Sequence, residues 1–102
     1  MSSLSIELKD EDESISGIVK IFYKGKFDGI QINAYMLGSS ELVQFIEANG
    51  KRISMPTRLY IARNDIVDNQ IRFKVSRYKG KARFRVAIIE EHKEIESEII
   101  FH

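Results

Sequence analysis

The sequence predicts an all-β protein built as a single antiparallel β-sandwich of about seven or eight strands. Short runs of β-branched and aromatic residues alternate with polar residues along most of the chain. Clusters of glycine, asparagine, aspartate and serine separate these runs at the spacing typical of a sandwich. A parallel sheet would need crossover helices, and the runs leave no room for them.

Composition limits the protein to one domain, residues 1–102. The hydrophobic fraction is 43% and the charged fraction is 30%, which excludes a disordered chain. The sequence has no cysteine, which excludes disulfides, thiolate metal ligands and a cysteine nucleophile. The net charge of +1 by itself favours neither a nucleic acid nor a membrane as partner. With no leader-like or membrane-length apolar segment, we expect a cytoplasmic protein without membrane insertion.

The first strands are expected on either side of an acidic connection, Asp10–Glu13. Residues 4–8 alternate between apolar and polar side chains and predict an opening strand. Residues 15–23 and 27–37 are two longer strand-like runs, joined by Lys24-Gly25-Lys26. This arrangement predicts that the two runs pair as a β-hairpin.

Residues 40–48 have two interpretations. Their apolar residues fall within one arc of a helical wheel, with Ser40 as N-cap and Asn49-Gly50 as a stop signal. Alternatively, residues 41–47 form a strand that turns at Asn49-Gly50 and returns through residues 51–54. Because the surrounding sequence is all β, we predict the strand.

The second half of the chain predicts four more strands, at residues 59–61, 71–76, 83–88 and 95–101. The second and third of these are expected to pair as another hairpin that turns at Tyr78-Lys79-Gly80-Lys81. The same tetrapeptide occurs at residues 23–26. At both places we expect the glycine to supply the positive φ of a short loop.

The first half of the chain resembles the arrestin-like family. The residues that carry the likeness are Leu4–Leu8, Ile15–Ile21 and Phe27–Ile32 with the later Gly38. The resemblance implies an immunoglobulin- or arrestin-like sandwich that binds other proteins. Arrestins have two sandwich domains and a buried polar core closed by a tail, whereas this chain has room for one sandwich. Their phosphate-sensing mechanism therefore cannot be transferred.

No pattern in the sequence indicates catalysis, and we expect no catalytic residue, cofactor or metal. His92 and His102 are expected in a turn and at the end of the sequence, where surface histidines are ordinary. Asp65 and Asp68, with the asparagines beside them, have oxygen ligands for a hard cation or carboxylates for acid–base chemistry. Such residues at turns more often serve the backbone.

The most distinctive surface feature is a run of basic residues without an acid among them. Its members are candidates for anion binding: Arg72, Lys74, Arg77, Lys79, Lys81, Arg83 and Arg85. In the predicted hairpin, Arg72, Lys74, Arg83 and Arg85 would share the outer face and attract a phosphate backbone, an acidic peptide or an anionic lipid. Alternatively, the acidic last strand lies alongside and neutralises them. Tyr23, Tyr35, Tyr60 and Tyr78 are available for base stacking, but nothing in the sequence gathers them on one face.

We therefore expect a non-enzymatic protein-binding or scaffold module that acts through a sheet edge or loops. Its partner would be another protein or a second copy, joined by edge-strand pairing. The alternative is binding of a nucleic acid or other polyanion by the basic hairpin, residues 70–90.

Overall fold

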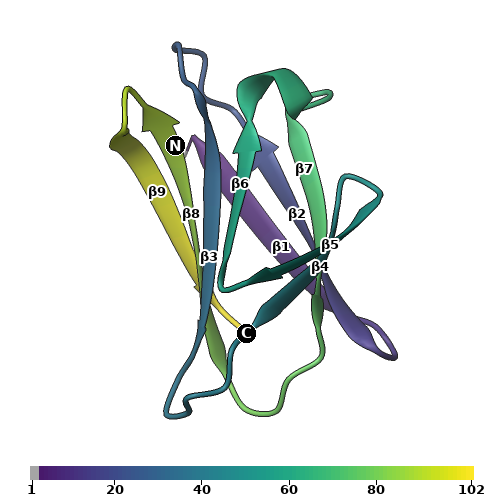
Figure 1. Ribbon diagram of the computed structural model, residues 1–102. Helices are drawn as coiled ribbons and strands as arrows, with labels where there is room; N and C mark the ends of the chain where they lie inside the picture. Colours follow the sequence, from purple (N-terminus) through teal and green to yellow (C-terminus); the bar gives the residue numbers. More distant parts are fainter. Residues whose placement is uncertain (1–2) are drawn as a thin grey trace.

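The computed structural model describes residues 3–102 as two antiparallel sheets packed face to face (Figure 1). This confirms the predicted all-β sandwich, with nine strands in the described residues where seven or eight were expected. The strands are β1 (Leu4–Asp10), β2 (Ser14–Ile21), β3 (Gly29–Met36), β4 (Gln44–Ala48), β5 (Lys51–Pro56), β6 (Arg58–Ala62), β7 (Gln70–Ser76), β8 (Ala82–Glu90) and β9 (Lys93–Phe101). A single turn of 3-10 helix, Arg63–Asp65, precedes β7.

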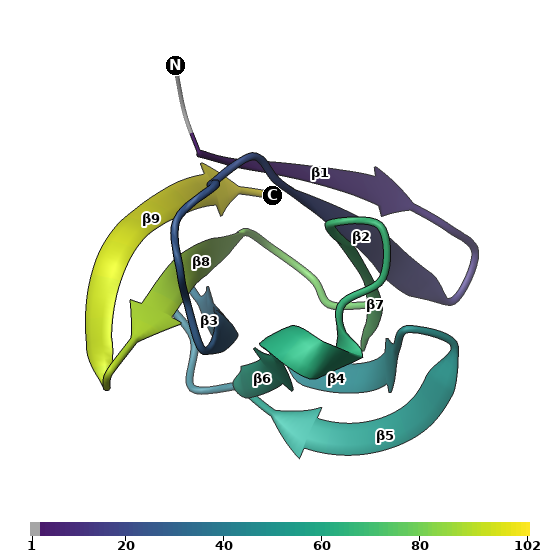
Figure 2. The ribbon, with the colours of Figure 1, turned by 90° about the horizontal axis from the view of Figure 1, so that it is seen from above.

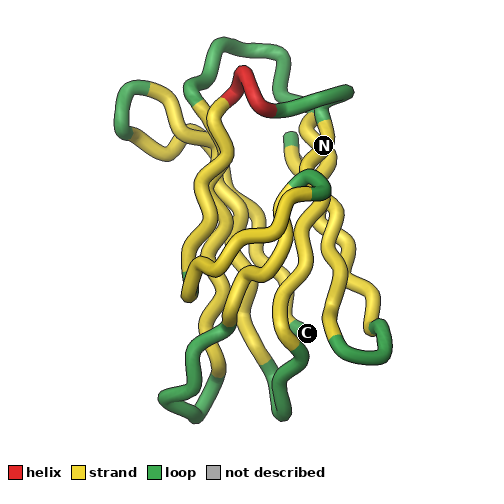
Figure 3. The backbone as a smooth tube through the Cα atoms, turned by 45° about the vertical axis from the view of Figure 1, so that its right-hand side comes forward, coloured by secondary structure: helices red, strands yellow, loops and turns green. Residues whose placement is uncertain are grey.

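One sheet has the order β1-β2-β7-β4-β5 and the other the order β6-β3-β8-β9. Seen from above in Figure 2, the two sheets form layers on either side of a common interior. The order β1-β2-β7-β4 corresponds to strands A-B-E-D of an immunoglobulin sandwich, and β3-β8-β9 corresponds to C-F-G. Strands β5 and β6 widen both sheets on the same side. Most connections lie at the two ends of the sandwich (Figure 3).

Both long hairpins predicted from the sequence are wrong, although their strands form. Strand β2 pairs with β1 and β7, whereas β3 pairs with β6 and β8 in the other sheet. Strands β7 and β8 are likewise in different sheets. The two connections, residues 22–28 and 77–81, therefore cross from one sheet to the other at opposite ends of the sandwich (Figure 1).

The tyrosine in each repeated tetrapeptide packs against the core at the point where the chain crosses between the sheets. Tyr23 and Tyr78 are partly buried against the core. Their ring centroids lie 6.2 Å from that of Phe27 and 6.4 Å from that of Phe84, respectively. Each aromatic ring covers an open end of the sandwich, which a tight hairpin at the same place would leave exposed to water.

The two glycines of these tetrapeptides have different roles. Gly80 has a φ of +91°, as predicted for a short loop. Gly25 is not in the positive-φ region, so the prediction is wrong there. A side chain at Gly25 would overlap the hydroxyl end of the Tyr23 ring, so it would force that ring to move.

Besides the β1–β2 hairpin, two hairpins with two-residue turns do form. Asn49 (φ 49°) and Gly50 (φ 83°) make the turn between β4 and β5, which confirms the strand interpretation of residues 40–48. Glu91 (φ 50°) and His92 (φ 65°) make the turn between β8 and β9.

The core lies between the sheets and is built by alternation along the central strands. Phe45, Phe73 and Phe84 are at most 1% exposed, and Phe73 lies between the other two with centroid distances of 5.6 Å and 6.3 Å. Because alternate residues of each strand are buried here, the residues between them must lie on the two outer faces.

Candidate binding surface

The seven basic residues singled out in the sequence do not form one patch. Arg72 and Lys74 lie on the outer face of the five-stranded sheet, and Arg83 and Arg85 on the outer face of the four-stranded sheet. These two faces point in opposite directions. The other three members, Arg77, Lys79 and Lys81, lie in the connection between β7 and β8.

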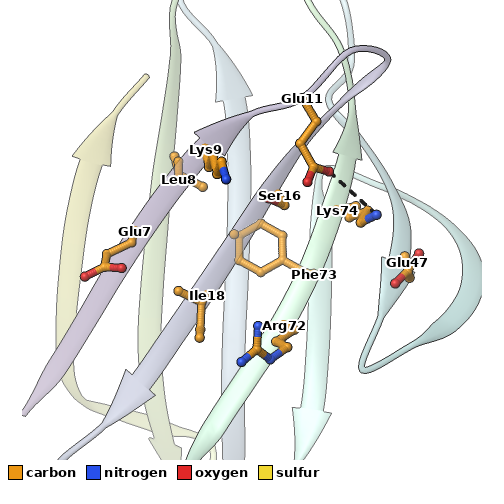
Figure 4. A pocket seen from close by; sticks show the side chains of 11 residues that line it. Glu7, Leu8, Lys9, Glu11, Ser16, Ile18, Glu47, Arg72, Phe73 and Lys74 are labelled. Carbon is orange, nitrogen blue, oxygen red and sulfur yellow. Dashed lines mark ion pairs between the residues drawn. The ribbon is translucent and has the colours of Figure 1, made fainter.

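The outer face of the five-stranded sheet carries charges of both signs around a hollow of about 390 Å³ (Figure 4). Lys74 Nζ lies 3.6 Å from Glu11 Oε1, and the Arg77 guanidinium donates a hydrogen bond of 2.6 Å to the backbone oxygen of Glu11. Acids and bases line the hollow in equal number: Glu7, Glu11 and Glu47 with Lys9, Arg72 and Lys74. With balanced charges, this face has no preference for an anion.

The acidic last strand neutralises one of the basic residues on the opposite side of the molecule. Glu94 accepts a hydrogen bond from the guanidinium of Arg85. This bond lowers the pKa of the Glu94 carboxyl and raises the pKa of the Arg85 guanidinium. Arg83 and Arg58 have no ion-pair partner within residues 3–102. Neutralisation by the last strand is therefore local.

The outer face of the four-stranded sheet also carries most of the exposed aromatic side chains, and we call it the Tyr–Arg face. The strand registers arrange its residues in rows across β6, β3, β8 and β9, and three of these rows carry its aromatic and arginine side chains. The rows are Tyr60–Gln31–Ala87–Ser97, Arg58–Asn33–Arg85–Ile99 and Tyr35–Arg83–Phe101.

The third row is the most apolar part of the Tyr–Arg face. Tyr35 and Phe101 lie on either side of Arg83 and are 44% and 52% exposed. Leu42, which is 66% exposed, extends the row through an isolated bridge to Tyr35. In the first row, Tyr60 is 48% exposed. Monomeric proteins seldom leave large apolar side chains side by side in water without a function for them.

The basic residues of the Tyr–Arg face are all arginines. The chain has nine lysines and seven arginines, and three of the arginines but none of the lysines lie on this face of the described structure. Its acid is Glu94, which is bound to Arg85. Enrichment in tyrosine, phenylalanine and arginine, with depletion of lysine and aspartate, is the composition of protein interfaces.

Sequence reasoning missed this surface, although part of the signal was present. Tyr35 alternates with Ala34 and Met36, and Tyr60 alternates with Leu59 and Ile61, so both tyrosines could have been assigned to outer faces. The missing information was the order β6-β3-β8, which places Tyr35 opposite Arg83 and brings Tyr60 onto the same face with β3 between it and β8.

The four sheet edges carry features that discourage strand pairing. Glu96 is on the core-facing side of β9, where its charge discourages another strand from pairing with this edge. Strand β5 carries Lys51 and ends at Pro56, and β6 is five residues long. Strand β1 is tied to the end of β9 by a contact of 2.8 Å between Asp10 Oδ1 and His102 Nε2.

Of the two aspartates considered as cation ligands, Asp65 ends the 3-10 turn and Asp68 lies in the following turn. In the described part of the chain, no group of three or more histidine or acidic side chains is placed to hold a metal ion. Asp68 and its neighbour Asn69 have positive φ and lie in the turn before β7, where they serve the backbone. Within residues 3–102, no helix has the length and apolar composition needed to cross a membrane.

No family model matches the sequence, and no curated protein does. A solved structure of the human F-spondin reeler domain (fragment 1) is similar over 99% of this chain and 89% of that chain, with 9% identity and a TM-score of 0.47. A likeness at this level carries no inference about function. None of the comparisons shows the arrestin-like family.

Proposed function

We propose that this chain is a non-enzymatic protein-binding module and that the Tyr–Arg face is its binding surface. The observation that carries the proposal is the row Tyr35–Arg83–Phe101, in which an arginine lies between two half-exposed aromatic side chains. Buried at an interface, aromatic and arginine side chains contribute more binding energy than other residues do.

A sheet face replaces the sheet edge expected from the sequence. Pairing at the β9 edge would bury the carboxylate of Glu96, which has to remain in water or find a cation. A partner that covers the Tyr–Arg face instead removes exposed apolar area from water and does not bury the charged residues at the sheet edges.

Nucleic-acid binding is the second candidate, and it would use the same face. Tyr35, Tyr60 and Arg83 lie on one surface, and aromatic rings beside arginines are the usual platform for unpaired bases. The basic hairpin first expected to carry this function is divided between opposite faces.

The test of the proposed function compares affinities for one purified partner. A protein that binds the immobilised chain is purified, and its affinity is measured for wild type and for the variant Tyr35→Ser with Phe101→Ser. We expect at least about a tenfold loss, because each aromatic anchor contributes about 1–2 kcal/mol or more at such an interface. Ile18→Ser, on the outer face of the five-stranded sheet, is the matched control and should bind normally. Full affinity in the double variant would overturn the proposal.

A further inference from the structure

We propose that the partner presents an acidic surface to the Tyr–Arg face; this inference rests on the proposed function and specifies its partner. Arg58 and Arg83 each lie beside apolar or amide side chains and have no carboxylate partner within the described residues. Burying these guanidiniums unpaired would cost more than the apolar contact gains. A partner that covers the face must therefore supply the missing carboxylates.

The two unpaired guanidiniums also determine the number and the spacing of the carboxylates that the partner must supply. Arg58 is on β6 and Arg83 is on β8, with β3 between them. Because neighbouring strands lie about 4.8 Å apart, the backbones that carry the two arginines are about 10 Å apart across the sheet. One carboxylate neutralises the charge of only one of the two guanidiniums, so the partner needs at least two.

A second copy of the chain does not meet this requirement. Two Tyr–Arg faces brought together would contain four unpaired guanidiniums. The acid that each face carries, Glu94, is already bound to Arg85. Like charges facing one another without counter-charges oppose association, so the face disfavours a homodimer.

A nucleic acid fits the charge distribution less well than an acidic protein does. On its β9 side the Tyr–Arg face ends at the carboxylates of Glu91, in the turn, and of Glu94, which is bound to Arg85. A strand of phosphates crossing the sheet from β6 to β9 would have to pass this acidic border. A protein can place acids over Arg58 and Arg83 and a neutral or basic group over β9.

The experiment uses two short peptides as probes. In one, glutamate alternates with leucine and tyrosine; in the other, glutamine replaces every glutamate. Each is added to the isotope-labelled protein while the amide NMR spectrum is recorded. We expect the glutamate peptide to shift resonances of β3, β6 and β8 and to bind at least about tenfold more tightly than the glutamine peptide, because two charge pairs are lost.

Variants connect the charge effect to the two arginines. Arg58→Gln with Arg83→Gln should abolish the preference for the glutamate peptide, whereas Arg72→Gln with Lys74→Gln removes the same charge from the opposite face and should preserve it. Arg58→Glu with Arg83→Glu should instead favour a peptide with lysine in place of glutamate. Both arginines are on the surface, and an unchanged amide spectrum shows that each variant is folded.

Each remaining outcome overturns the inference. These outcomes are equal shifts with the glutamine peptide, no shifts on the Tyr–Arg face with the glutamate peptide, tighter binding of an oligothymidylate, and self-association through this face in light scattering. The proposed function fails separately. It fails if the purified partner binds Tyr35→Ser with Phe101→Ser with the same affinity as wild type. If that variant loses affinity but Arg58→Gln with Arg83→Gln does not, only the inference of an acidic partner is overturned.

Discussion

Phe73 lies directly opposite Gly17 across the β2–β7 pair, and its ring fills the space that a side chain at position 17 would occupy. Gly17 faces the core, so any Cβ there would overlap the phenyl ring, which is 1% exposed and lies against Phe45 and Phe84. The glycine is therefore required by packing and not by a turn.

The first prediction is that Gly17→Ala destabilises the protein by about 1–3 kcal/mol, the usual cost of overpacking a filled core. Urea denaturation measures the change in the free energy of unfolding. Adding Phe73→Leu should make the double variant lose less stability than the sum of the two single changes, because the overlap is relieved. Ser16→Ala, on the outer face of the same strand, is the control. A Gly17→Ala protein as stable as wild type would contradict the overlap.

The second prediction concerns Tyr78, whose hydroxyl donates a hydrogen bond of 2.8 Å to the backbone oxygen of His102. Burial, with a smaller effect from the negative charge of Asp10, raises the pKa of Tyr78 to about 12. The phenol is protonated in the folded protein at pH values where it ionises in the unfolded chain. The free energy of unfolding should therefore fall as the pH rises from about 10 to about 12.

Tyr78→Phe separates the two effects of this hydroxyl. At neutral pH the variant should lose about 1 kcal/mol with the hydrogen bond. Between pH 10 and 12 its stability should decline less steeply than that of wild type, because the perturbed phenol is gone. Denaturation curves at several alkaline pH values measure both, and Tyr60→Phe on the surface is the control. An identical alkaline decline in Tyr78→Phe would show that another group is responsible.

The strands could be predicted from the sequence, but their pairing could not. Alternation between apolar and polar residues depends on which face of a strand is buried, and that is the same whether the next strand lies beside it or in the opposite sheet. Residues 22–28 and 77–81 are short enough for a hairpin loop and also long enough to cross about 10 Å between sheets. In the structure both connections cross between the sheets, and Tyr23 and Tyr78 pack against the core from them.

The candidate surface was only partly predictable for the same reason. Alternation places Arg83 and Arg85 on an outer face, and this is what the structure shows. Their neighbours on that face come from β3, β6 and β9, which are brought together by the sheet order and not by sequence proximity. Arg72, close in sequence to Arg83, lies on the other side of the molecule.

The third prediction is that the turn between β8 and β9 can be improved. Glu91 and His92 both have positive φ, a conformation that asparagine and glycine adopt at lower cost. Replacing the pair by Asn-Gly should stabilise the protein by about 1 kcal/mol and raise its Tm. The hydrogen bond of 2.7 Å from the Glu91 backbone N–H to Asp28 Oδ2 should persist, since it does not use the replaced side chain. In the turn that already has this sequence, Gly50→Ala should destabilise; an unchanged Tm in both variants would contradict the argument.

The last prediction concerns Glu96 and the exposed edge of β9. Glu96 lies opposite Ile88 on the core-facing side of the strand, whereas Ser97 lies opposite Ala87 on the outer face. A second β9 paired at this edge would bury the Glu96 carboxylate of each copy, which keeps the edge unpaired. Glu98, opposite Val86, is on the same side of β9. The variant Glu96→Val with Glu98→Val removes both core-facing carboxylates and leaves a long strand with apolar residues on both faces, so we expect concentration-dependent self-association in light scattering. Ser97→Val adds a similar apolar side chain without removing the charge and should remain monomeric at the same concentrations. Association of Ser97→Val to the same extent would show that apolar area, and not the guarding charge, controls the edge.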